Sequence, residues 1–140
     1  MVKKVKRSKI TAIIICASVL VVAVGLGINA YKYLEAKKVI TFSKEEITRA
    51  YITSGNTGEI TELTGDNLEL IYNDFKDITM KRIKNIDSTG WNYSVDFLVN
   101  NNTTRITIIS ATEWNFSGNR YKVFIEEGEK IFNDIAQIAN

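Results

Sequence analysis

The hydrophobic pattern of this chain begins with an uninterrupted apolar run. Nineteen uncharged residues extend from Ile10 to Ile28, and no acid occurs before Glu35. A helix rises about 1.5 Å per residue, so the run reaches roughly 28 Å, close to the bilayer's hydrocarbon thickness of about 30 Å. A helix also satisfies its own backbone hydrogen bonds, as a segment in lipid must. The pattern predicts a transmembrane helix over residues 10–30, in contact with the lipid bilayer.

A basic cluster stands directly before the apolar run. It consists of Lys3, Lys4, Lys6, Arg7 and Lys9. Positive residues that flank a span stay on the cytoplasmic side. We therefore expect residues 1–9 to form a basic cytoplasmic tip, the protein to cross the cell membrane once, and its C-terminal part to lie outside the cell.

Two other fates of this segment stay open. A cleaved secretory signal has a shorter apolar core, of about 7–15 residues, and small residues at its cleavage site. In the candidate cleavage site Ile28-Asn29-Ala30, Ile28 occupies a position where a small residue is preferred. A lipid anchor on Cys16 would need a small residue before it, and Ile15 occupies that position. The sequence favours an uncleaved signal anchor.

Beyond the apolar run, residues 31–45 read as a short stalk, and the pattern then changes to period two. Apolar and polar residues alternate in runs rich in Ile, Thr and Tyr, which is typical of half-buried strands. Gly55-Asn56-Thr57-Gly58 separates the first two runs and predicts a hairpin, because Asn and Gly accept positive φ values. Further turns are predicted at residues 87–90 and 117–119. The predicted strands are residues 46–54, 59–63, 80–86, 91–99, 105–111 and 120–126.

Two segments show helical periodicity instead. The first apolar stripe consists of Leu68, Ile71, Tyr72, Phe75 and Ile78, and the second of Ile131, Phe132, Ile135, Ile138 and Ala139. They predict amphipathic helices over residues 66–77 and 129–139. The element order β-β-α-β-β-β-β-α, with hairpin connections, predicts an α+β extracytoplasmic domain over residues 46–140. We expect an antiparallel sheet with both amphipathic helices packed on one face.

The composition removes several classes of function. Five of the eighteen basic residues lie in the tip, so the rest of the chain holds thirteen basic against sixteen acidic residues, a net charge of −3. This acidic part lacks the basic face of a nucleic-acid-binding protein, so nucleic acid is not an expected partner. Histidine is absent and Cys16 is the only cysteine, so neither a thiolate zinc site nor an internal disulfide can form. We expect no cofactor and no metal site.

The acidic residues invite an acid–base mechanism, but their placement argues against one. Asp74 and Asp77 lie on the polar face of a predicted helix. Glu126 and Glu127 lie just ahead of the other predicted helix, and Glu129 begins it. Glycoside hydrolysis needs two carboxylates that face each other across a cleft, whereas neighbours on a polar face are solvated. A serine nucleophile would lack an activating base. We expect no catalytic residue and interpret the protein as a non-enzyme.

Large aromatic side chains are the remaining candidates for ligand contact. Trp91, Trp114 and Tyr121 fall on or just beyond adjacent predicted strands, and exposed rings of this kind can hold a glycan or a peptide. Rings on the inner face of a sheet more commonly belong to the core. Trp91 and Trp114 lie at strand ends, so we expect these two to be the most exposed.

Several short motifs resemble one group of bacterial proteins. These motifs are Gly55-Asn56-Thr57-Gly58, Asp66 at the helix start, Gly90-Trp91-Asn92-Tyr93-Ser94-Val95-Asp96-Phe97 and Tyr121-Lys122-Val123. Over residues 45–140 the chain resembles small uncharacterised extracytoplasmic domains of Gram-positive bacteria, which follow a membrane or lipid anchor and are known as domains of unknown function. The resemblance implies an exported domain of the cell envelope and brings no catalytic residues with it.

The function that we expect is binding rather than catalysis. The predicted protein is a membrane-anchored extracytoplasmic domain whose partner is another envelope protein or a wall component. An envelope immunity or inhibitor protein, which shields its target, is the second hypothesis. A hydrolase that depends on carboxylates is the third.

Overall fold

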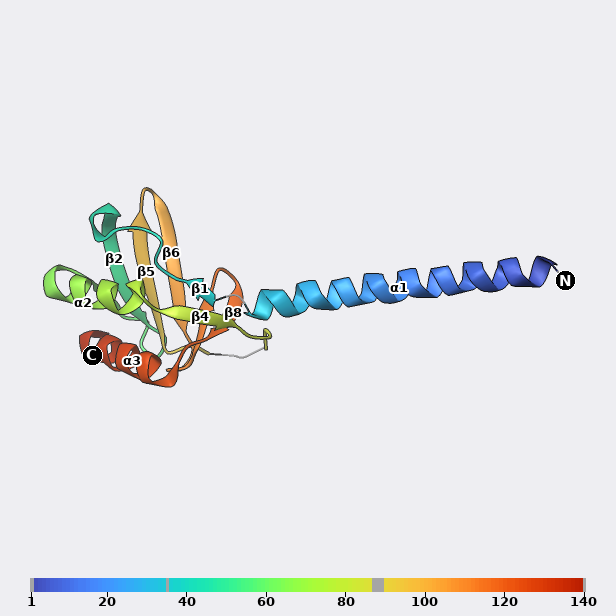
Figure 1. Ribbon diagram of the computed structural model, residues 1–140. Coiled ribbons are helices and arrows are strands. Elements are labelled where there is room, and N and C mark those ends of the chain that lie inside the picture. Colours follow the sequence, from blue (N-terminus) through green and yellow to red (C-terminus); the bar gives the residue numbers. More distant parts are fainter. Residues whose placement is uncertain (1, 35, 87–89, 140) are drawn as a thin grey trace. The chain divides into compact units, whose positions relative to one another are not determined.

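A computed structural model describes residues 2–34, 36–86 and 90–139 of the chain. The chain divides into two compact units, Met1–Glu35 and Ala36–Asn140. The first contains a single helix, and the second is an α+β domain with an antiparallel sheet (Figure 1). The predicted fold class of the domain is confirmed.

The first unit holds helix α1, Val2–Leu34, which is 33 residues long. Within it, the structure describes the side chains of residues 12–28 and 30. Ten large aliphatic side chains of this stretch are each at least 53 % exposed. The side chains of the predicted basic tip, residues 1–9, lie outside the described residues. In the part of the chain that the structure describes, no helix is long and apolar enough to qualify as a membrane span.

The domain is built on a sheet of eight antiparallel strands in the order β1-β4-β8-β7-β6-β5-β2-β3. The strands are β1 (Ala36–Lys38), β2 (Ile47–Ser54), β3 (Ile60–Glu62), β4 (Thr79–Arg82), β5 (Tyr93–Val99), β6 (Asn102–Ile108), β7 (Glu113–Phe116) and β8 (Asn119–Lys122). The helical elements are the 3-10 helix η1 (Lys44–Glu46) and the helices α2 (Gly65–Lys76) and α3 (Ile125–Ala139). Strand β4 pairs with β8. The segment that follows β4 therefore begins beside the hairpin of β7 and β8.

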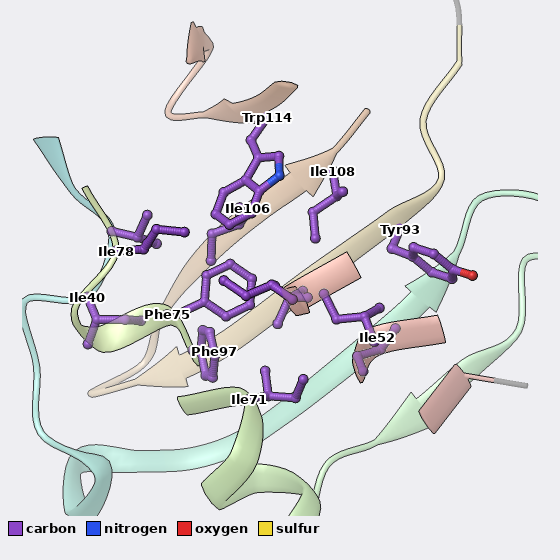
Figure 2. Close-up of a cluster of buried hydrophobic side chains, with 14 of the residues drawn as sticks. Ile40, Ile52, Ile71, Phe75, Ile78, Tyr93, Phe97, Ile106, Ile108 and Trp114 are labelled. Carbon is purple, nitrogen blue, oxygen red and sulfur yellow. The ribbon is translucent and has the colours of Figure 1, made fainter. Parts of the chain in front are cut away.

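Helices α2 and α3 bury side chains in the same core as the sheet. Ile71 and Phe75 come from α2, and Ile135 comes from α3. Figure 2 shows Phe75 among the sheet residues, with its ring centroid 5.2 Å from that of Trp114 and 6.2 Å from that of Phe97. We call the side of the sheet that carries Phe97 and Trp114 the inner face, and the opposite side the outer face.

Both predicted amphipathic helices are confirmed, with shifted starts. Helix α2 begins at Gly65 rather than at residue 66, and α3 begins at Ile125 rather than at residue 129. A Cβ on the buried Gly128 would lie 2.0 Å from the carbonyl oxygen of Ala111. The glycine therefore lets the first turn of α3 rest directly on the backbone between β6 and β7. The strand predicted over residues 120–126 ends at Lys122 as β8, since α3 already begins at Ile125.

The predicted stalk, residues 31–45, is wrong for its second part. Strand β1 lies within it and pairs with β4. Val39 and Ile40, which follow β1, are buried in the core. Two of the three residues of β1 are lysines, so no hydrophobic alternation marks this strand in the sequence. The domain therefore begins at Ala36 and not at residue 46.

The sheet has eight strands instead of the predicted six, because β1 and β7 are additional. Strands β7 and β8 form a hairpin around Ser117 and Gly118, which have φ values of 51° and 75°. The turn predicted at residues 117–119 is thus confirmed, and so is the hairpin around residues 55–58, which joins β2 and β3. For the turn predicted at residues 87–90, positions 87–89 lie outside the described residues.

Candidate functional site

A row of five polar residues crosses the outer face of the sheet. We call it the polar row, and in strand order from β2 to β8 it contains Thr53, Ser94, Thr107, Asn115 and Arg120, each in register with the next. Adjacent residues of a strand point to opposite faces. The chain neighbours of this row, such as Ile108 and Trp114, therefore point into the core. The sheet presents a polar surface opposite its hydrophobic one.

A second outer-face pair lies next to the polar row. Asp96 of β5 stands opposite Arg105 of β6. Arg105 donates to both carboxylate oxygens, from Nε at 2.7 Å and from Nη2 at 2.6 Å. Hydrogen bonding to Asp96 raises the pKa of the Arg105 guanidinium above its usual value. This bidentate geometry is the strong form of a charged hydrogen bond, and it satisfies an acid that the sheet buries.

Two adjoining cavities form a groove over the polar row, which we call the outer groove. They enclose about 440 and 330 Å³, and Thr107 and Asn115 line both. The larger cavity is also lined by Asn85, Ile86, Gly90, Trp91, Ile109 and Arg120. The smaller is also lined by Thr103, Thr104, Arg105, Phe116, Ser117 and Gly118. Strands β6 to β8 thus provide the floor, and the segments on either side of residues 87–89 provide a wall.

Asn85 fixes one part of that wall against strand β8. Its Oδ1 accepts a hydrogen bond from the Arg120 backbone N–H at 3.0 Å, and its Nδ2 donates to the Gly118 carbonyl at 3.5 Å. The Ile83 backbone N–H donates to the Arg120 carbonyl at 2.9 Å. The segment after β4 is therefore held along the hairpin of β7 and β8 by backbone and amide contacts.

Trp91 is positioned by its backbone rather than by burial of its ring. The Gly55 N–H donates to the carbonyl of Asn92 at 2.7 Å, and Asn92 Nδ2 donates to the carbonyl of Ile109 at 2.7 Å. A Cβ on Gly55 would lie 2.1 Å from the Trp91 carbonyl oxygen, so only glycine permits this approach. The indole is left 40 % exposed beside the outer groove.

Two guanidinium groups line the outer groove, and each lies beside an acid. Among the described residues that line it, the charged ones are Arg105 and Arg120. Arg120 is only 5 % exposed, and its Nη1 lies 3.7 Å from Glu113 Oε2. The acids that pair with these two arginines, Asp96 and Glu113, lie beside the groove and not among its lining residues.

The structure separates the three predicted ligand-contact residues. The expected exposure of Trp91 is confirmed. Trp114 is fully buried and Tyr121 is 3 % exposed, so the expected exposure of Trp114 is wrong. Both rings lie on the inner face, where they stand opposite each other in the register of β7 and β8. Trp114 lies within β7, a strand that the pattern did not predict, and not at the end of a neighbouring one.

Of the described groove residues, the sequence interpretation found Trp91 and missed the rest, among them Thr107, Asn115 and Arg120. Thr107 alternates with two buried isoleucines, and Arg120 precedes a buried tyrosine. This alternation indicates an outer-face position for each residue separately. Only the order of the strands brings them together.

The acidic residues in and near the helices differ in solvent exposure. Asp77, Glu126, Glu127 and Glu129 are exposed, as expected. Asp74 is not solvated as predicted, since its side chain is only 8 % exposed and its Oδ1 lies 2.5 Å from Lys130 Nζ of α3. Lys130 also reaches Asp134 at 2.8 Å. The polar face of α2 turns toward α3 at this point.

The environment shifts the pKa values of this Asp74–Lys130–Asp134 cluster. Burial raises the pKa of Asp74, and the hydrogen bond from Lys130 only partly offsets it. Burial also acts to raise the pKa of Asp134, but hydrogen bonds from Lys130 and Asp74 outweigh it and leave that pKa below its usual value. The cluster lies outside the lining of the outer groove. In the described part of the chain, no set of three metal-ligating side chains converges.

No protein-family model, curated protein or solved structure matches this chain. The resemblance to anchored extracytoplasmic domains therefore stays a prediction from the sequence.

Proposed function

We propose that the protein is a membrane-anchored binding protein whose domain lies outside the cytoplasm and holds its ligand in the outer groove. The groove carries this proposal, because it combines a polar floor, two guanidinium groups and an exposed indole on the sheet face opposite the core. Binding sites are typically concave, with an apolar wall and a few placed polar groups. The expected ligand is part of another envelope protein or a wall component.

The apolar run supports the anchor. Nineteen uncharged residues follow five positive charges, and the described aliphatic side chains of α1 are exposed. Exposed apolar surface of this extent calls for a nonpolar environment. Positive charges before the run favour a cytoplasmic N-terminus. A cleaved signal and a lipid anchor on Cys16 are the competing fates of the segment.

Binding is favoured over catalysis by the groups that the groove contains. Its described lining offers amides, hydroxyls and guanidinium groups, and no acid or base that titrates near neutral pH. General acid–base catalysis needs such a group within reach of the substrate. The clustered acids of α2 and α3 are instead tied together by Lys130.

An inhibitor or immunity protein is the second candidate, because acids gather at the start of α3. Glu126, Glu127 and Glu129 are all exposed there and would complement a basic enzyme cleft. Replacement of all three by lysine should abolish growth protection if this surface blocks a toxic enzyme. The same replacement should leave binding in the outer groove unchanged.

The main proposal is tested by photocrosslinking in intact cells. A photoreactive phenylalanine analogue replaces Trp91 in the full chain, and in a matched control it replaces Phe124, an exposed aromatic residue outside the groove. We expect a specific adduct from position 91 and none from position 124. Equal adducts from both positions, or none from position 91, would contradict the proposal.

A further inference from the structure

We infer that the ligand of the outer groove is a glycan strand whose sugars carry carboxylate groups. This inference rests on the proposed function and names the chemical class of the ligand. Four features of the groove lead to it: its guanidinium donors, its length, its exposed ring and the pairing of its floor strands.

The guanidinium donors favour a carboxylate. Arg105 and Arg120 line the groove, and they are paired with Asp96 and Glu113. The two bonds to Asp96 use Nε and Nη2 of Arg105, two of five guanidinium donors, and this side chain is 64 % exposed. Guanidinium groups bind carboxylates in a planar fork, so a carboxylated ligand matches the groove.

The length favours a chain of several units. Two interstrand steps and two residues along a strand separate Arg105 from Arg120 in the register. Ideal spacings of about 4.8 Å and 3.4 Å place their Cα atoms about 12 Å apart. Because the two cavities share Thr107 and Asn115, one extended ligand can lie along both.

The neutral lining favours sugar rings. The exposed indole of Trp91 provides a flat apolar surface beside Ile86, which is also exposed. A sugar ring can cover such a surface with its C–H face while its hydroxyls stay at the edge. Hydroxyls and amides that both donate and accept, from Thr103, Thr107 and Asn115, line the floor. This mixture matches a polyhydroxylated ring.

The strand pairing argues against an extended peptide. Peptides commonly bind sheets by adding a strand to a free edge. The floor strands β6, β7 and β8 each have a paired strand on both sides, so their backbone groups are engaged within the sheet. A ligand over them must be held by side chains, as a glycan is.

The test measures binding of oligosaccharides to the full chain in detergent. The probe is a fluorescent hexamer of galacturonic acid, and its methyl-esterified form is the matched neutral ligand. We expect saturable binding of the acid form, at least about tenfold weaker binding of the ester, and weakening by added salt. Equal binding of both forms, or no binding of the acid form, would overturn the inference. Equal binding of a hexamer of glutamate would replace the glycan by an acidic peptide.

Two variants locate the binding. Trp91→Ala should weaken binding about tenfold, whereas Phe124→Ala, an exposed aromatic residue outside the groove, should leave it unchanged. The double variant Asp96→Asn/Arg105→Gln keeps a hydrogen-bonding pair while removing one guanidinium group, and should also weaken binding. Thermal unfolding of each variant checks that it is folded. Equal effects of the Trp91 and Phe124 variants would place the glycan elsewhere.

The outcomes also separate this inference from the proposed function. If the acidic oligosaccharide does not bind while position 91 still forms its specific adduct in cells, the ligand class is wrong and the outer groove remains the binding site. If neither occurs, both fail.

Discussion

Arg105 of β6 donates two hydrogen bonds to the carboxylate of Asp96 on the neighbouring strand β5, of 2.7 and 2.6 Å. The acid is nearly buried, with 12 % of its side chain exposed, while 64 % of the arginine side chain is exposed. The pair therefore anchors one side of the outer groove and satisfies a carboxylate that faces away from the core.

Removal of this arginine should destabilise the domain. Arg105→Ala leaves Asp96 with no charged partner, which costs about 2 kcal/mol of the free energy of unfolding, a typical value for hydrogen bonds to charged groups. Urea unfolding measures the loss. The neutral pair Asp96→Asn/Arg105→Gln, which can still form a hydrogen bond, should recover most of it. An unchanged urea midpoint for Arg105→Ala would show that the pair is not a structural contact.

The two tryptophans should differ in solvent exposure and in their contribution to the free energy of unfolding. Trp114 is fully buried and contacts Phe75, whereas Trp91 is 40 % exposed. Trp114→Ala should cost about 3–5 kcal/mol of stability, and Trp91→Ala about 1 kcal/mol or less. In the single-tryptophan variants, iodide should quench the emission of Trp91 and not that of Trp114. The reverse order of quenching would contradict the assignment of the faces.

Gly55 should be required for the position of Trp91. A methyl group at residue 55 would meet the Trp91 carbonyl oxygen at 2.1 Å, and backbone cannot yield as a side-chain tip does. Gly55→Ala should therefore lower the free energy of unfolding by about 1–3 kcal/mol and shift Trp91 emission. Asn56→Ala, at an exposed position of the same turn, is the control and should change neither quantity appreciably. Equal unfolding midpoints for the two variants would refute the close approach.

The Asp74–Lys130–Asp134 cluster should give stability a pH dependence of two signs. The pKa of Asp74 is raised in the folded state, mainly by burial, so its contribution is fully present below its usual pKa and is lost as pH rises through the folded value. Asp74→Asn should therefore gain stability relative to the native chain as pH rises from about 4 to 7.

Asp134 provides the opposite case within the same cluster. Its pKa is lowered, since the hydrogen bonds from Lys130 and Asp74 outweigh burial. Its contribution is present above the usual pKa and is lost as pH falls through the folded value. Asp134→Asn should thus lose stability relative to the native chain as pH rises from below the folded pKa of Asp134 to about 5. Urea unfolding at several pH values measures both slopes, and slopes of equal sign would contradict the cluster's geometry.

Much of the fold could be predicted from the sequence, because its signals are local. Helix α2 and the end of α3 follow apolar stripes, and the hairpin of β2 and β3 follows its turn residues. Strands β1 and β7 have three and four residues, too few for alternation to be visible. In β1, two of the three residues are lysines, so no hydrophobic alternation marks this edge strand before the buried Val39 and Ile40.

The outer groove could be predicted only in part. Alternation within each strand indicates which face Thr107 and Arg120 occupy, but their proximity depends on the order β8-β7-β6. The wall at Asn85 depends on the pairing of β4 with β8, which joins segments far apart in the sequence. Such pairings leave no periodic trace in the chain. The exposure of Trp91 could be predicted because the residue lies at the start of a strand with clear alternation.

The most direct test of the account is thiol labelling of the groove in intact cells. Cys16 is the only native cysteine, so Cys16→Ser permits a unique probe at Asn115→Cys in the groove or at Asn73→Cys on the exposed face of α2. With a membrane-impermeant maleimide, position 73 should react in intact cells, and position 115 should react only after the ligand is washed away from purified protein. Equal labelling of position 115 before and after washing would contradict an occupied groove, and labelling of position 73 only in permeabilised cells would contradict the proposed location.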